Sequence, residues 1–158
     1  MSAQLIFDLA PLGSVIRYSD GTPRPPERHR KKLAAWESRN SGGRLIRKQA
    51  GTLVGNTRLP ASITLHDGDY GGAGLIVLRI HRSFSVDSDM KFAVIERPAA
   101  GAVQVLDRPG AAGELVHLAK SREAAQTWLT SHGYPNAVLH EVTAEQAAAK
   151  AVEERSAS

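Results

Sequence analysis

Alternation of apolar and polar residues predicts a sheet in the middle of the chain. The strongest pattern covers residues 75–86, where apolar side chains recur at every second position and only Arg82 interrupts them. A half-buried antiparallel strand produces this alternation, because successive side chains point to opposite faces. Residues 90–97 supply the expected hairpin partner across the loop 87–89, in a register that keeps the apolar residues of both strands on one side.

This register also brings positive charges together. It places Phe84 opposite Phe92 on the core side, and Arg79 opposite Arg97 on the other side, close to Lys91. Like charges directly across a ladder repel each other. Carboxylates from elsewhere in the fold are the simpler compensation, and a bound anion or an acidic partner is the alternative.

Shorter apolar runs bounded by Gly, Asn or Pro predict further strands. They cover residues 12–18, 44–48, 61–66, 102–106, 114–119 and 137–142.

Three helices are predicted from capping signals and from apolar spacing. Pro26 suits the first position of a helix over residues 26–40, because its missing N–H would have no partner there anyway. Ser121 caps a second helix. A capping box that runs from Thr143 to Gln146 begins a third, Ala-rich helix.

These elements predict one α+β domain over residues 1–158. Its sheet is expected to be mostly antiparallel with about five to seven strands, accompanied by one basic N-terminal helix and two C-terminal helices. The C-terminus is expected to fray over residues 153–158. The chain has 158 residues, enough for a self-sufficient core.

The N-terminal helix has a narrow apolar stripe. Only Leu33 and Trp36 are strong core candidates on one face, whereas the opposite face carries cations. Residues 19–43 are therefore predicted to form a basic helical segment that is mobile.

Charge is concentrated near the N-terminus. Residues 1–50 hold 10 Lys and Arg against 4 Asp and Glu, whereas residues 51–158 hold 10 against 12. A positive region on a nearly neutral body suits a polyanion or an acidic protein surface. The residues expected to form one docking face are Arg24, Arg28, Lys31, Lys32, Arg39, Arg44, Arg47, Lys48, Arg79, Lys91 and Arg97.

Three functions are compatible with this profile. The first is a small non-catalytic protein that docks on nucleic acid or a nucleoprotein complex, as an accessory protein of a mobile element would. The second is a protein-interaction module, an inhibitor or adaptor, that engages an acidic protein. The third is a metal-independent ribonuclease with His81 or His117 as acid–base and Arg79 as phosphate stabiliser. A solvated surface helix is the plain alternative for the basic tract itself.

Several chemistries are disfavoured by the sequence. The chain has no Cys, so disulfides, thiolate metal sites and a Cys nucleophile are excluded. The segment from His66 to Asp69 is typical of a tight turn rather than a metal site, and no cofactor motif is present. No signal peptide and no apolar stretch of about 20 residues is visible, so a cytoplasmic protein without a membrane partner is expected.

Overall fold

The computed structural model describes residues 1–72 and 75–148. In chain order the elements are α1 (Ala3–Leu9), β1 (Val15–Ser19), α2 (Arg30–Arg39), β2 (Gly42–Gln49), β3 (Thr52–Val54), β4 (Thr57–Leu59), β5 (Ser62–Gly72), β6 (Leu75–Ser85), β7 (Lys91–Glu96), β8 (Val103–Leu106), β9 (Leu115–Ala119), α3 (Arg122–Thr130), β10 (Val138–Glu141) and α4 (Ala144–Ala148). The predicted α+β class is confirmed.

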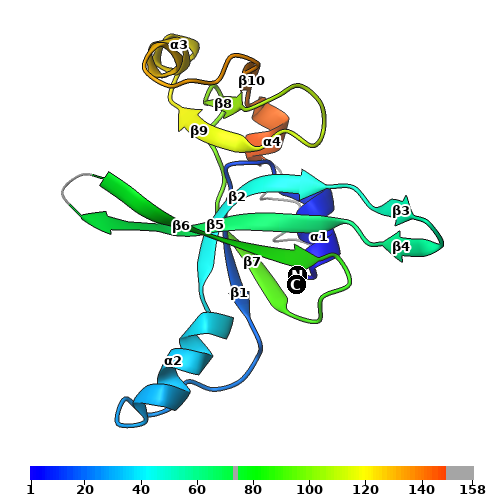
Figure 1. The fold of residues 1–158 in the computed structure, drawn as a ribbon, viewed down its shortest axis with the longest axis vertical. Helices are drawn as coiled ribbons and strands as arrows, with labels where there is room; N and C mark the ends of the chain where they lie inside the picture. Colours follow the sequence, from blue (N-terminus) through cyan, green and yellow to red (C-terminus); the bar gives the residue numbers. More distant parts are fainter. Residues whose placement is uncertain (73–74, 149–158) are drawn as a thin grey trace.

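The main sheet has five strands in the order β6-β5-β2-β1-β7, and every pairing is antiparallel. Although β6 and β7 are the two edges, Phe84 and Phe92 from these strands meet edge to face with ring centroids 5.2 Å apart. The sheet therefore curls around its core, and α1 lies against β5 and β7 (Figure 1).

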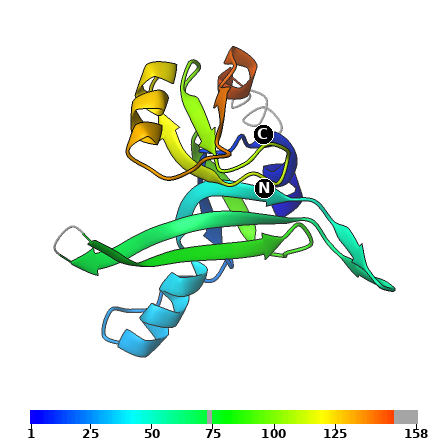
Figure 2. The same ribbon diagram turned by 45° about the horizontal axis from the view of Figure 1, so that its top comes forward.

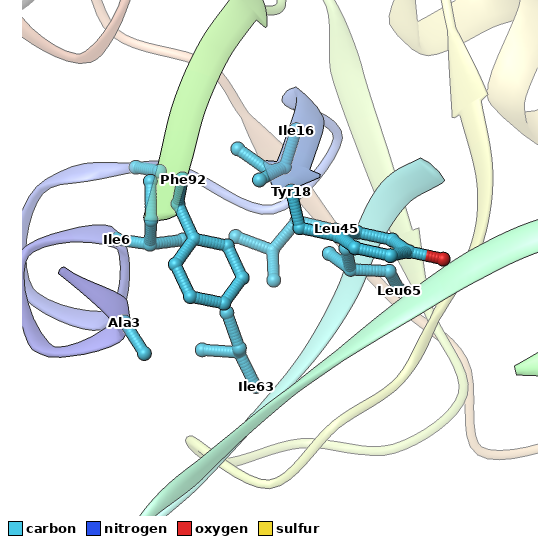
Figure 3. Close-up of a cluster of buried hydrophobic side chains, with 9 residues drawn as sticks. Ala3, Ile6, Ile16, Tyr18, Leu45, Ile63, Leu65 and Phe92 are labelled. Atoms are coloured by element: carbon cyan, nitrogen blue, oxygen red, sulfur yellow. The ribbon is translucent and has the colours of Figure 1, made fainter. Parts of the chain in front are cut away.

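The core lies on the concave side of this sheet. Figure 3 shows the Phe92 ring between Ile6 of α1 and Ile63 of β5, with Tyr18 and Leu45 beside them. These side chains are at most 3% exposed, and burying a large apolar side chain contributes roughly 1.5–3 kcal/mol. Packing between α1 and the sheet thus contributes to the stability of the larger unit.

The predicted hairpin between residues 75–86 and 90–97 is wrong. β6 pairs with β5 along its length, and β7 pairs with β1 at the opposite edge. The 11 residues of β5 match the 11 of β6, which gives a longer ladder than the 6 residues of β7 offer. Arg79 is consequently opposite Asp69, not Arg97, so the expected repulsion does not arise.

A second unit is formed by the C-terminal third of the chain. Its sheet has the order β10-β8-β9 and packs on α3 around Val103, Val105 and Ala125. The predicted caps are confirmed, since Ser121 Oγ accepts from Ala124 N, and the Thr143 and Gln146 side chains bond to each other's backbone N–H. Figures 1 and 2 show this unit on the side of the main sheet away from α2.

Helix α2 begins later than predicted. It starts at Arg30 rather than Pro26, and His29 N bonds to Pro26 O in a turn before it. Helix α1 and the short β3–β4 sheet are additional elements that the sequence did not predict. No helix in the described ranges is long and apolar enough to cross a membrane. The predicted fraying of residues 153–158 lies outside the described residues.

Candidate functional site

Residues 22–40, which we call the basic arm, carry six Lys and Arg side chains and two Glu. Their balance of +4 equals the formal net charge of the whole chain, so the rest of the protein is neutral overall. All six cationic side chains are exposed: Arg24, Arg28, Arg30, Lys31, Lys32 and Arg39. Arg30 was missing from the predicted set, because helical spacing places it off the face that carries Arg28 and Lys32.

The arm stands away from the sheet in both views (Figures 1 and 2). No residue of α2 is buried, and the predicted inward residues Leu33 and Trp36 are half-buried while Lys31 and Lys32 are exposed. The predicted two-faced helix with a narrow apolar stripe is thus confirmed. Hydrophobic packing contributes little to holding this helix in place.

Polar contacts fix the base of the arm instead. Asn40 Oδ1 accepts from Ser19 Oγ at 2.8 Å and from Asp20 N at 3.2 Å, while Asn40 Nδ2 donates to Asp20 Oδ1 at 3.2 Å. Trp36 Nε1 donates to Thr22 O at 3.0 Å. Hydrogen bonds from the Thr22 side chain and backbone lower the pKa of Asp20, so its carboxylate stays charged in this network.

The other predicted cations do not all join the arm. Lys91 lies beside Gly21 at the base of the arm. Lys48 lies near Asp8 of α1, and its pKa is lowered by burial against the opposing effect of that carboxylate. Arg97 Nη1 donates to the carbonyl oxygen of Leu9, also in α1.

Two further cations lie on the other face of β2. Arg44 lines a cavity beneath β9, and Arg47 is close enough to Asp107 to interact with its charge. The side chain of Arg79 is outside the described part of the structure. The expectation of one docking face containing all eleven cations is therefore wrong, because adjacent residues of β2 point to opposite sides of the sheet. A smaller set remains together: Arg24, Arg28, Lys31, Lys32, Arg39 and Lys91.

The cavity beneath β9 has a volume of about 540 Å³. Its polar lining comes from the main sheet and the small sheet: Arg44, His66, His81, Glu114, His117 and Tyr134. Glu114 and Tyr134 were not predicted as site residues. No motif along the sequence could have identified this group of residues, because they come from four strands and two loops.

The segment from His66 to Asp69 is part of β5, not a tight turn, and the register shifts there. Asp67 Oδ2 pairs with Arg82 Nε at 3.5 Å, and Asp67 Oδ1 accepts from Ser41 Oγ at 3.3 Å. Among the described residues, no three His, Asp or Glu side chains are placed to hold a metal ion together.

Searches among curated proteins and among solved structures gave no match. A family model described as "Uncharacterised conserved protein UCP036055" matches residues 1–146, which include the basic arm and all residues named in the cavity. Because the match covers most of the 158 residues, the chain belongs to this family.

Proposed function

We propose that this chain is a non-catalytic cytoplasmic protein that docks on nucleic acid through the basic arm. The observation that carries the proposal is the concentration of the whole net charge in residues 22–40, on a helix that has no buried residue. Lys and Arg side chains that contact phosphates release condensed counterions, which makes binding favourable without base recognition.

The arm's dimensions suit a phosphate backbone. Its helix has 10 residues and is therefore about 15 Å long, a length over which a duplex presents roughly nine phosphate charges. Phosphates are thus more numerous than the arm's six cations. The salt dependence of binding is then set by how many of those cations make contact.

An acidic protein surface is the alternative partner. Stable protein interfaces centre on aromatic and aliphatic side chains that become buried on binding. The large apolar side chains of the arm, Leu33 and Trp36, are half-buried, and Trp36 also bonds to the Thr22 carbonyl. The side chains that the arm exposes to a partner are mainly cationic, and this favours nucleic acid over a protein as the partner.

Fluorescence anisotropy with short single-stranded and duplex nucleic acids, over about 50–300 mM salt, tests the proposal. We expect affinity to fall steeply with salt. Replacing Lys31, Lys32 and Arg39 by Ala should reduce the slope of log affinity against log salt by about 2 to 3, at roughly 0.7–0.9 per phosphate contact.

A matched control removes three exposed cations elsewhere: Arg58, Lys120 and Arg122. This control causes the same change in net charge but leaves the cations of the basic arm in place. It should therefore lower affinity only slightly and leave the slope nearly unchanged. Equal slopes for the two triple variants, or no binding at the lowest salt, would contradict the proposal. Binding to an acidic polypeptide without binding to nucleic acid would support the alternative partner.

A further inference from the structure

The cavity beneath β9 is independent of the arm. Arg44 is opposite His66, and His66 is opposite His81, in the registers of β2, β5 and β6. Residues directly opposite on antiparallel strands share a face, with Cβ atoms about 5 Å apart. One guanidinium and two imidazoles therefore form a continuous row along one wall, and the two imidazole rings meet edge to face with centroids 5.6 Å apart.

The opposite wall of the cavity carries the rings of His117 and Tyr134, and both rings stack on Trp128, which is not part of the lining. The ring of Trp128, on α3, stacks on His117 with centroids 4.7 Å apart and planes 4° from parallel. Trp128 also stacks on His132 and Tyr134, at 3.8 and 5.6 Å. Two of the lining rings, His117 and Tyr134, are thus fixed by one indole, which lowers the entropy lost when a ligand binds.

Arg44 is a half-buried cation that has no carboxylate partner among the described side chains. Its Nη1 donates to Gly13 O at 2.6 Å, which anchors one end of the guanidinium. Other arginines, such as Arg82 and Arg108, have an Asp within 3.5 Å, whereas no ion pair to Arg44 occurs in the described residues. A guanidinium has five N–H donors, so donors remain for a ligand in the cavity.

We propose that this cavity binds a small phosphomonoester. The guanidinium of Arg44 matches the geometry of phosphate oxygens, and the exposed imidazole of His81 adds a neighbouring N–H donor. Glu114 accepts a hydrogen bond from a hydroxyl or amine of the ligand. The rings of His117 and Tyr134 contact its organic part. A volume of about 540 Å³ is in the range of small-molecule sites.

The test is an NMR titration of histidine ring nitrogens with two probes, inorganic phosphate and adenosine 5′-monophosphate. We expect both probes to shift His66, His81 and His117, and to leave the exposed His140 nearly unchanged. The monophosphate should bind about tenfold or more tightly than phosphate, because its base contacts the aromatic wall. Equal affinities would overturn the role given to that wall.

Matched variants on β2 locate the phosphate. Arg44→Gln should weaken binding of both probes by about 10-fold to 100-fold, since a charge-assisted hydrogen bond is lost. Arg47→Gln removes the same charge from the same strand, outside the cavity lining, and should change affinity by less than about threefold. Equal effects of the two variants would overturn the proposal.

Two further variants keep the test decisive. If Arg44→Gln does not fold, His81→Ala replaces an exposed ring and should weaken phosphate binding several-fold; unchanged affinity would overturn the proposal. The arm variant that lacks Lys31, Lys32 and Arg39 should keep full binding of both probes. Loss of binding in that variant would assign the phosphate to the arm instead and overturn the cavity site.

Discussion

Replacement of Asn40 by Ala should release the basic arm without unfolding the protein. The Asn40 side chain takes part in four hydrogen bonds, to Ser19, to the backbone and carboxylate of Asp20, and to the Trp36 carbonyl. Because α2 buries no residue, these bonds are a large share of what holds it.

The magnitude follows from the exposure of the network. A typical hydrogen bond contributes about 0.5–1.5 kcal/mol net. Asn40 and Asp20 are half-buried, so water can replace part of each bond. We therefore expect a total loss of about 1–3 kcal/mol, concentrated in the local unfolding of the arm, which is about 5-fold to 150-fold in its opening equilibrium.

Hydrogen exchange measures this directly. Amides of α2 should exchange about 5-fold to 150-fold faster in Asn40→Ala, whereas amides of β2 and β5 keep their protection and Tm changes by only a few degrees. Ser38→Ala is the control, because its hydroxyl bonds only to the exposed Ala35 carbonyl on the same helix. Unchanged exchange in α2, or equal acceleration in α2 and the sheet, would refute the reasoning.

Three other predictions concern the body of the protein. Gly43→Ala should destabilise it by about 2 kcal/mol or more in thermal unfolding, because the new Cβ would lie 2.6 Å from a β5 carbonyl oxygen, whereas Gly133→Ala meets nothing within 4 Å; equal effects would contradict this. Tyr18→Phe should be neutral or stabilising within about 1 kcal/mol in denaturant unfolding, because the buried hydroxyl makes no hydrogen bond of good geometry, although the Ser41 side chain is close enough to interact with it; a larger loss would show that the contact with Ser41 is a stabilising hydrogen bond. The pKa of His117 should be below about 6.5 by NMR titration, because burial and then the charge of His132 disfavour its protonated form, and His132→Ala should raise it. A His117 pKa that is lower in the folded than in the unfolded protein stabilises the fold. This contribution is fully present above about pH 6.5 and is lost as pH falls through the folded pKa; a pKa above 6.5 would contradict the assignment.

The C-terminal elements could be predicted because their signals are local. A cap such as Ser121 and the capping box at Thr143 act within one turn of helix, so the sequence shows both partners. Helix α1 had similar signals. Ser2 caps it, and Ala3, Ile6 and Ala10 are buried at helical spacing, a pattern visible in the sequence but obscured by its short length.

Strand partners could not be predicted in the same way. Alternation over residues 75–86 predicted a strand with Phe84 on the core side, and Phe84 does pack against the core, but a hairpin with either neighbouring strand satisfies the alternation equally well. Phe84 and Phe92 were expected to be opposite each other, and their rings do meet, although across the two edges of a curled sheet. The placement of Phe84 and Phe92 on the core side was right, whereas the strand partner of β6 and the residue opposite Arg79 were wrong.

The residues that line the cavity could not be grouped from the sequence. Arg44 was noted for its charge, His66 as part of a turn and His117 as a lone histidine, and no spacing connects them in the chain. They meet because β2 and β5 are neighbours in the main sheet and β9 packs against β2, a consequence of tertiary structure rather than local pattern.

The basic arm and the cavity beneath β9 are separate surfaces, and they would select their ligands by different physical means. Since residues 22–40 hold the whole net charge, the rest of the chain exerts little long-range attraction on anions. Exposed cations on the arm are screened by salt and attract any polyanion, so they can provide affinity but little discrimination. The half-buried Arg44 is screened less and has fixed neighbours, so selection at the cavity depends on shape and on hydrogen bonds. In our proposals, one small chain thus combines an unselective electrostatic surface with a site whose geometry can discriminate between phosphate compounds.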